Sequence, residues 1–239
     1  MAASGCRRAS GTATTPTFLG LTGPTGFWES LGADGENVVI GVLDTGFWPE
    51  ALSFSDQTGT NPNGKPGKRG YQQIPGWHGK CTPGEAFNAS MCNQKVIGAQ
   101  AFGAGCEANV GIPDFELESP RDWDGHGAHT SSTAGGNFGV QPTGDAAGFT
   151  PISGIAPRAR ISVYKVCFEL PDQSTANCFS SDRVQAIDQS VADGVDVLNH
   201  SIGATLTNFL DPVQVAFFNA AGAGVFVAAS AGNSGPTAS

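Results

Sequence analysis

Apolar residues in this chain form short continuous runs separated by glycine-rich or amphipathic stretches. The first run, residues 37–43 (NVVIGVL), ends at Asp44, and further strand-like runs occupy residues 161–166, 195–201 and 225–229. Short apolar runs bounded by turn residues are typical of buried parallel strands. The pattern therefore predicts four core strands, the first of which carries an acid at its carboxyl end.

Helical patterns lie between these runs. Ser181 can cap a helix that extends to about residue 192 and places three aliphatic residues on one face. Asp211-Pro212 is a favourable N-cap and first-turn pair for a helix to about residue 221. A short helix of small residues is expected over residues 128–133, where two glycines follow.

The alternation of strands and helices predicts an α/β fold, with a parallel β-sheet and helices on both faces. Residues 47–122 are rich in Gly, Pro and Asn, and predict an extended surface insertion with one short strand at 95–99. Residues 1–15 are small, polar and weakly basic, without the apolar core of a signal peptide. We expect this N-terminal segment to be disordered.

Composition excludes two classes of partner. The net charge of -9 and the pI of about 4.7 argue against a nucleic-acid surface. No apolar run approaches the roughly 20 residues of a membrane span, so no membrane association is expected. Charged residues make up only 14% and glycines number 34, which favours tight turns over a disordered acidic chain.

The six cysteines indicate the kind of cellular compartment in which the protein folds. Two pairs, Cys81 with Cys92 and Cys167 with Cys178, have the same separation, and neither has zinc-ligand spacing. Paired cysteines in a chain of low charge favour an oxidising compartment, although free buried thiols are the alternative. The glycosylation triplet Asn88-Ala89-Ser90 points the same way.

Candidate chemistry gathers where the strands end. Ligands of open parallel sheets bind beyond the carboxyl ends of the strands, where Asp44, residues 201–203 and residues 230–233 fall. His126 stands between two glycines at the start of the small-residue helix. An Asp that orients a His, a His that accepts a proton and an amide that donates to an oxyanion together indicate acyl transfer.

Each of these residues also has a simpler explanation. An Asp at a strand end often caps a turn, a His between glycines often lies in a surface loop, and an Asn before Ser-Gly often forms a turn. His126 and His129 have a spacing open to metal ligands, but no further His or Glu falls at a ligand spacing. No metal site and no cofactor are therefore expected.

Longer strings favour the catalytic interpretation. VVIGVLDTGFWPE, DGHGAHTSSTAGG, GIAPRARISVYKVC, DGVDVLNHSIGA and VAASAGNSGP occur in this order. Together they resemble the subtilisin-like (peptidase S8) serine proteases, and WHGKCTPGEAFNASMCNQKVIGAQAF is similar to the plant-type branch, which also occurs in bacteria. The resemblance implies that residues 16–239 are the N-terminal part of a three-layer peptidase domain, truncated on its C-terminal side.

The resemblance also implies roles for individual residues in a serine endopeptidase that hydrolyses protein or peptide substrates with a Ser-His-Asp triad. Asp44 resembles the triad acid, His126 the general base and Asn233 the side chain that donates to the oxyanion. Two short segments resemble the two walls of the pocket that binds the substrate residue before the scissile bond. They are Ser201, Ile202 and Gly203 for one wall, and Ala231 and Gly232 for the other. The resemblance further implies the disulfides Cys81–Cys92 and Cys167–Cys178.

The chain departs from the family pattern in three places. Ala128 stands where the family has Thr, which is expected to loosen the start of the helix. His200 replaces a small or apolar residue, and either packs within its strand or faces substrate. No Gly-Thr-Ser-Met block occurs in the 239 residues, so the family's nucleophile is absent from them, as is the inhibitory propeptide expected in a full-length precursor.

Two hypotheses follow from these departures. The first is a fragment of a secreted serine protease, and the second is a short, non-catalytic protein that keeps the peptide-binding walls. Retention of both Asp44 and His126 favours the first hypothesis.

Overall fold

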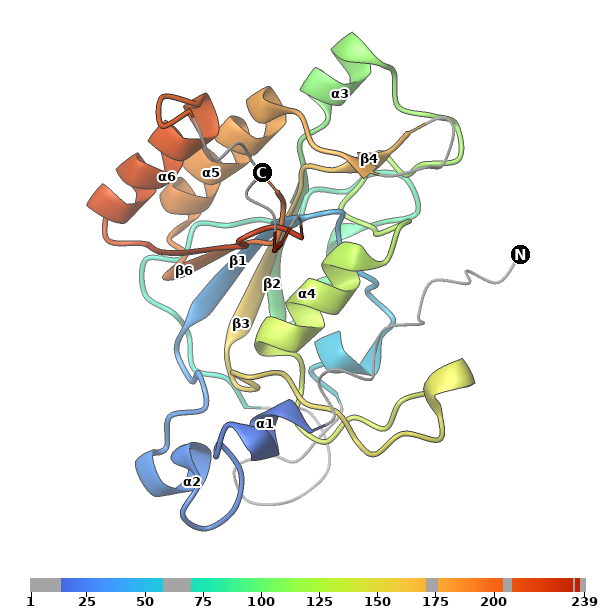
Figure 1. Ribbon diagram of the computed structural model, residues 1–239. Helices are drawn as coiled ribbons and strands as arrows, with labels where there is room; N and C mark the ends of the chain where they lie inside the picture. Colours follow the sequence, from blue (N-terminus) through green and yellow to red (C-terminus); the bar gives the residue numbers. More distant parts are fainter. Residues whose placement is uncertain (1–13, 58–69, 171–175, 204–207, 234, 237–239) are drawn as a thin grey trace.

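A five-stranded parallel sheet forms the centre of the computed structural model, which describes residues 14–57, 70–170, 176–203, 208–233 and 235–236 (Figure 1). The strands lie side by side in the order β2-β3-β1-β6-β7. Their bounds are β1 Val39–Asp44, β2 Val96–Ala101, β3 Arg160–Lys165, β6 Val197–His200 and β7 Phe226–Ala229. Every pairing between them is parallel, so all five carboxyl ends meet at one edge.

Helices cover both faces of this sheet. Helix α4 (His126–Gly135) lies on one face, and α5 (Ser180–Asp193) and α6 (Pro212–Gly222) lie on the other (Figure 1). Successive strand residues point to opposite faces. Ile40 and Val42 accordingly pack in the α4 layer, whereas Val39 and Leu43 pack with α5 and α6. The predicted α/β fold with helices on both faces is confirmed.

The two helix starts predicted on the α5 and α6 side have different outcomes. Asp211 caps α6 as predicted, because its Oδ1 accepts from the Val213 amide at 2.9 Å. The prediction that Ser181 caps α5 is wrong, since that helix begins at Ser180 without a side-chain cap. Asp182, in its first turn, instead accepts from two backbone amides of α3 (Ala104–Asn109). A contact distant in sequence therefore anchors this helix start.

The prediction of an extended surface insertion over residues 47–122 is also wrong in part. Phe47, Phe54 and Phe87 are buried and meet edge to face beneath the insertion. These three rings lie far apart in a Gly- and Pro-rich stretch, so their burial leaves no periodic pattern in the sequence. The insertion also contains α3, which was not predicted, and the edge strand β2, which was.

Smaller elements complete the described chain. They are α1 (Thr15–Phe18), α2 (Phe27–Leu31), three short 3₁₀ helices (Leu52–Phe54, Ala89–Met91 and Gly144–Ala146) and the hairpin of β4 (Phe168–Glu169) with β5 (Ala176–Asn177). Most of the segment predicted to be disordered lies outside the described residues. Thr15, however, begins α1, so the boundary placed after residue 15 is too late.

Both predicted disulfides are confirmed, Cys81 with Cys92 and Cys167 with Cys178. Cys106 is a buried free thiol, and Cys6 lies outside the described residues. Closing a loop of this size stabilises a fold by roughly 2–3 kcal/mol if the effect is mainly on the entropy of the unfolded chain. Within the described part of the chain, no helix combines the length and apolar character that crossing a membrane requires.

Candidate active site

Asp44 ends the central strand β1, and its side chain is only 1% exposed. Its Oδ1 accepts from the Thr45 amide at 2.8 Å, and its Oδ2 accepts from the Thr130 hydroxyl at 2.9 Å. The adjacent strand holds its backbone, because the amides of Val166 and Cys167 both donate to the Asp44 carbonyl oxygen. Asp44 is therefore fixed both at its carboxylate and at its main chain.

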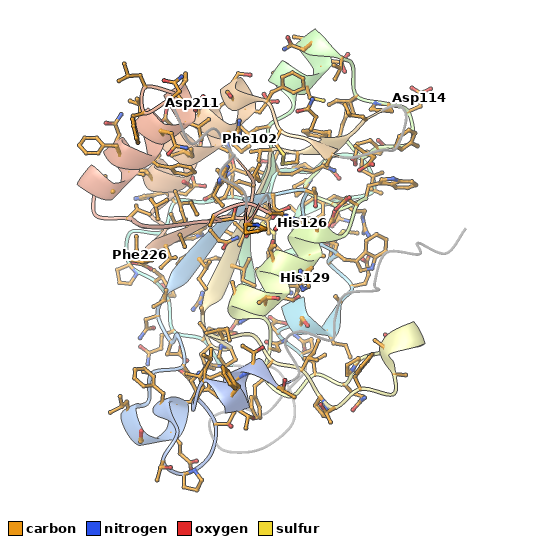
Figure 2. The ribbon with its side chains drawn as sticks, in the orientation of Figure 1. Phe102, Asp114, His126, His129, Asp211 and Phe226 are labelled. Carbon is orange, nitrogen blue, oxygen red and sulfur yellow. A yellow bond between two sulfur atoms is a disulfide. The ribbon has the colours of Figure 1, made fainter. Side chains whose placement is uncertain are left out.

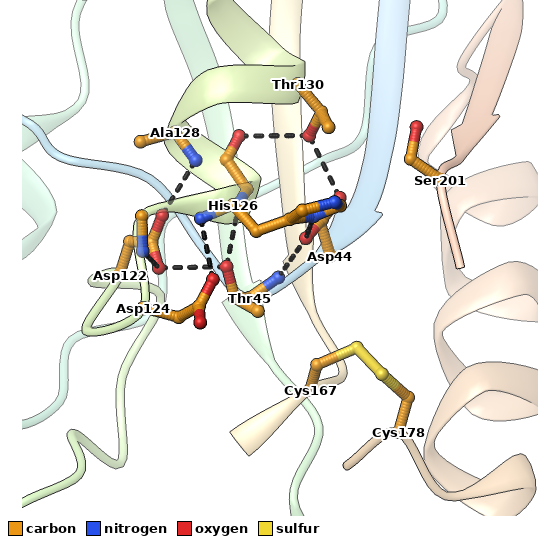
Figure 3. A network of polar contacts seen from close by, with 12 residues as sticks. Asp44, Thr45, Asp122, Asp124, His126, Ala128, Thr130, Cys167, Cys178 and Ser201 are labelled. Carbon is orange, nitrogen blue, oxygen red and sulfur yellow. Dashed lines mark hydrogen bonds and ion pairs between the residues drawn. A yellow bond between two sulfur atoms is a disulfide. The ribbon is translucent and has the colours of Figure 1, made fainter. Parts of the chain in front are cut away.

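His126 is the first residue of α4, and its ring reaches the carboxylate of Asp44 (Figure 3). The distance from Nδ1 to Asp44 Oδ1 is 2.7 Å. Because an ionised carboxylate can only accept, Nδ1 carries the proton in this contact, and Nε2 of the neutral ring is free to accept another. The side chain of His126 is 45% exposed, so this second nitrogen belongs to a ring that solvent reaches.

The loop before α4 is held by a second buried carboxylate, that of Asp122. It accepts from the amides of Gly125 at 2.8 Å and Ala128 at 2.7 Å, and from the Thr45 hydroxyl at 2.9 Å (Figure 3). A carboxylate beside the first turn satisfies free amides and suits the helix dipole. The helix begins at His126, two residues before the predicted start, so alanine at position 128 does not delay it.

Close contact of two backbones brings the His segment onto the Asp segment. The Gly127 amide donates to the Thr45 hydroxyl at 2.7 Å. A Cβ atom at position 127 would lie 2.3 Å from the Gly46 carbonyl oxygen, so only glycine fits there. This contact places α4 against the end of β1, which allows His126 and Asp44 to meet.

Electrostatics at this site favour a charged imidazole. The pKa of His126 is raised above its ordinary value, first by the hydrogen bond with Asp44. Partial burial of the ring opposes the shift, and the charges of Asp44, Asp124 and Asp122 add to it. Burial raises the pKa of Asp122, while its bonds from Gly125, Ala128 and Thr45 oppose that rise.

The predicted pocket walls leave neighbouring strands at the same edge of the sheet. His200, the last residue of β6, pairs with Leu43 of β1 and with Ala229 of β7. Asp44 directly follows Leu43 and Ser201 directly follows His200, so the two residues lie at the same end of neighbouring strands. Figure 3 shows Ser201 at the end of its strand on the Asp44 side. The first wall continues through Ile202 and Gly203.

The second wall, residues 231–232, follows β7 and is exposed, as is Asn233 after it. It starts beside the first wall, because the Ser230 amide donates to the His200 carbonyl oxygen at 3.1 Å. Gly232 adopts a positive φ of 79° and turns the chain, and Asn233 follows it with an exposed side chain. The structure thus brings Asp44 and His126 into contact and places the other predicted residues at the same sheet edge.

Known proteins resemble this chain over most of its length. The model of the subtilase family matches residues 35–239. The chain belongs to the subtilase family. It is 44% identical to subtilisin-like protease SBT1.7 of Arabidopsis thaliana over 234 residues and 43% identical to subtilisin-like protease SBT3 of Solanum lycopersicum over 226 residues. These matches cover 95% and 93% of this chain.

The subtilase chain spans less than a third of its relatives, 28% of SBT1.7 and 27% of SBT3. Among solved structures, the prenylagaramide maturation protease PagA is 17% identical and has a TM-score of 0.44. The match covers 84% of this chain and 48% of that one, an overlap too loose to carry structural detail across.

His200, one of the departures from the subtilase pattern, packs inside the fold. It is 2% exposed, and its ring meets Phe217 of α6 edge to face with centroids 4.9 Å apart. Burial, together with the charge of Arg183, lowers its pKa to about 4. The expectation of a packed strand histidine is confirmed, and a ring so buried does not face substrate.

Sequence reasoning missed the residues that position the Asp–His pair. Thr45, Asp122 and Thr130 were not singled out, although all three lie within four residues of Asp44 or His126. The string DWDGHG could have predicted the role of Asp122, because an acidic residue a few positions before a helix can cap its first turn. Thr130 is visible in the sequence only as one of several small polar helix residues.

A buried ion pair supports the same loop and was also missed. Lys165, which pairs in register with Asp44, donates to Glu116 Oε1 at 2.8 Å and to the Arg121 carbonyl oxygen at 2.9 Å. Both charged side chains are at most 1% exposed. Burial lowers the pKa of Lys165, and Glu116 opposes that shift. The pair therefore ties the segment before Asp122 to the end of β3.

His126 and His129 lie in the same helix, at the spacing considered above for metal ligands. In the regions that the structure describes, no group of three or more His, Cys, Asp or Glu side chains is placed to hold a metal ion. The Nδ1 atom of His126 is instead occupied by Asp44.

Replacing Asp44 by asparagine is expected to lower the pKa of His126, because the largest cause of the raised value is lost. NMR titration of the histidine ring protons in the purified chain measures this directly. Asp124→Asn is the matched control: Asp124 accepts from the His126 backbone amide at 2.9 Å but affects the pKa of the ring only through its charge, so this variant should produce a smaller decrease. Equal decreases in the two variants would contradict a specific role for Asp44.

The same substitution has a predictable effect on stability. Folding raises the pKa of His126, so the protonated ring stabilises the folded state. This stabilisation is fully present below the pKa of about 6.5 in the unfolded chain, and it is lost as pH rises through the pKa in the folded chain. Asp44→Asn should therefore destabilise the fold more at pH 5 than at pH 8.

Proposed function

We propose that this chain is the N-terminal part of the catalytic domain of a secreted serine endopeptidase, with Asp44 and His126 as the acid and base of its Ser-His-Asp triad. The supporting observation is the 2.7 Å contact between a fully buried carboxylate and a half-exposed imidazole. A structural ion pair does not require one ring nitrogen to remain accessible, whereas a general base does.

The geometry suits the proton transfers of acyl transfer. Nε2 of His126 accepts the proton of the serine hydroxyl as that oxygen attacks the peptide carbonyl, and later returns it to the leaving amine. Asp44 keeps the proton on Nδ1 and stabilises the imidazolium that forms. The raised pKa of His126 agrees with this role, because the same contact that raises it favours the charged ring.

The proposed substrate is an extended protein or peptide segment. The exposed backbone after β6 and β7, at residues 201–203 and 231–232, offers hydrogen-bonding groups to a chain that adds as a further strand. Asn233 is proposed to donate its side-chain amide to the oxyanion. An inhibitory propeptide is proposed for the full-length precursor, and no cofactor enters the mechanism.

Secretion is proposed on the strength of the cysteines. Two disulfides form within the described chain, and such bonds persist in oxidising compartments. One of them, Cys167–Cys178, begins next to the backbone that holds Asp44, so reduction would affect the site itself (Figure 3).

The coding sequence beyond codon 239 tests this proposal against the non-catalytic alternative. An in-frame Gly-Thr-Ser block supports the protease, whereas a stop codon at that point supports a peptide-binding protein. A fluorophosphonate should label the longer product at the serine of that block, and His126→Ala should abolish the labelling.

The purified 239-residue chain is expected to resist the same reagent, because no serine in it stands in a nucleophile block. Mass spectrometry of the treated chain measures this. Stoichiometric labelling at one serine of the 239-residue chain would show that the nucleophile has been misassigned.

A further inference from the structure

Two triplets in this chain have the Asn-x-Ser pattern that accepts N-linked glycans, Asn88-Ala89-Ser90 and Asn199-His200-Ser201. Sequence alone does not rank them, because neither has proline in the middle. The structure places them in very different surroundings, one on an exposed turn and the other inside the central sheet.

The first triplet lies on the surface. Asn88 is exposed and caps the 3₁₀ helix Ala89–Met91, where its Oδ1 accepts from the Ser90 amide at 3.0 Å and from the Ser90 hydroxyl. Both contacts use the side-chain oxygen. No hydrogen bond to its Nδ2 is found within the described residues, so the atom that would carry a sugar takes no part in the polar contacts of the turn.

The turn is also rigidly attached. The Met91 amide donates to the Asn88 carbonyl oxygen at 3.0 Å, and the disulfide Cys81–Cys92 follows directly. The preceding residue, Phe87, is buried in the core beneath the insertion. A glycan on Asn88 would therefore extend from a fixed point on the surface without displacing any of these contacts.

The second triplet is built into the sheet. Asn199 lies in β6, between Val42 of β1 and Ala228 of β7, and its side chain is half-buried. Its Nδ2 donates to the Ser201 hydroxyl at 3.0 Å, and the middle residue, His200, is 2% exposed. A sugar on this nitrogen would break the hydrogen bond to Ser201. It would also have to fit against a sheet face on which Asn199 is already half-buried.

We propose that Asn88 is an N-glycosylation site of this protein and that Asn199 is unmodified in the folded, secreted chain. This proposal rests on the secretory location included in the proposed function. The donor is a lipid-pyrophosphate-linked oligosaccharide supplied by the transferase of a eukaryotic secretory pathway. Nδ2 of Asn88 bonds to the anomeric carbon of the first sugar, the bond from that carbon to the pyrophosphate oxygen breaks, and the amide nitrogen loses one proton.

Transfer takes place on the nascent chain, so the fold acts afterwards by deciding which modified chains can mature. A glycan at Asn88 leaves the turn and the disulfide in place. A glycan at Asn199 interrupts β6, the strand that connects β1 to β7. Chains modified there are expected to be retained and degraded, and not secreted.

The experiment expresses the 239-residue chain behind a secretion signal in a eukaryotic cell line. Intact mass is measured before and after treatment with an amidase that removes N-linked glycans, and peptide mapping locates the Asn-to-Asp change that the amidase leaves. One glycan, at Asn88, is expected on the secreted chain.

The variants test whether the glycan depends on the Asn-x-Ser pattern at residues 88–90 or on other changes to the turn. Ala89→Pro keeps both Asn88 and Ser90 but blocks transfer, and proline suits the first position of a short helix. It should remove the glycan, as should Asn88→Gln, whereas Ser90→Thr should keep it. Ser201→Ala removes the second triplet and should leave the mass shift unchanged.

An unmodified Asn88, or a glycan at Asn199 on the secreted chain, would overturn the proposal. If a variant is not secreted, the retained chain is analysed in the same way, and absence of a glycan at Asn88 in the retained parent chain also counts against it. Glycan occupancy does not depend on catalysis. A full-length protein that is glycosylated at Asn88 but not labelled by a fluorophosphonate would therefore disprove the protease proposal alone.

Discussion

Replacing His126 by alanine in the proposed full-length protease is expected to lower kcat by about 10⁶-fold, the magnitude known for the catalytic histidine of subtilisin itself. The imidazole is proposed both to accept the nucleophile's proton and to return it to the leaving group. No other described side chain contacts the Asp44 carboxylate with a titratable nitrogen. The measurement is kcat per folded molecule, with a peptide substrate at saturation.

His129→Ala is the matched control for this prediction. It removes an imidazole from the same helix, one turn further on, and leaves the Asp44–His126 pair in place (Figure 2). It should leave kcat within a few-fold of the parent value. Comparable losses in the two variants would mean that the helix, and not the base, had been damaged.

Four strands of the central sheet and the start of α6 could be predicted from the sequence because their patterns are local. Continuous apolar runs identified β1, β3, β6 and β7. The expectation that all four are core strands is wrong for β7: β1 and β3 are buried throughout, whereas the edge strand β7 has no buried residue. The cap of α6 was predictable for the same reason, since Asp211 bonds an amide only two residues away. The start of α5 was not, because Asp182 reaches across to another helix.

The same distinction between local patterns and contacts distant in sequence applies to the candidate site. Asp44 and His126 were predictable as single residues because each stands in a long string that resembles a family, and each marks the end or start of an element. Their supporting contacts depend on how β1 and α4 approach. Asp122 bonds both to its own loop and to Thr45, which precedes it by 77 residues. Periodicity contains no information about such a pairing, whereas Gly127 does hint at the close approach that produces it.

The roles of Asp122 and of the Lys165–Glu116 pair follow from burial. A buried carboxylate is stabilised only if its oxygens are satisfied, and Asp122 meets this need with amides of the His126 loop. Lys165 does the same with Glu116 and with backbone carbonyl groups of the preceding segment. Together they hold both ends of the loop that precedes His126, so groups outside the proposed proton transfer set the geometry of the proposed base.

Replacing Asn233 by alanine in the proposed full-length protease is expected to lower kcat by about 10²–10³-fold, the loss known for the oxyanion asparagine of subtilisin. The proposed hydrogen bond strengthens only as negative charge develops on the former carbonyl oxygen. KM should therefore change little, because the ground-state substrate gains little from this donor.

The rival interpretation makes Asn233 only a turn former between Gly232 and the following Ser-Gly pair, and Asn233→Gly distinguishes the two. Glycine supports the turn at least as well as asparagine but has no amide to donate. If Asn233 is the oxyanion donor, the Gly and Ala variants should lose kcat equally. If it only forms the turn, Asn233→Gly should keep full activity, and Asn233→Ala should lower the stability of the fold while leaving kcat per titrated active site unchanged. Measuring kcat per active site, together with the denaturation midpoint of each variant, separates these outcomes, because an oxyanion role changes the rate and a turn role changes the stability.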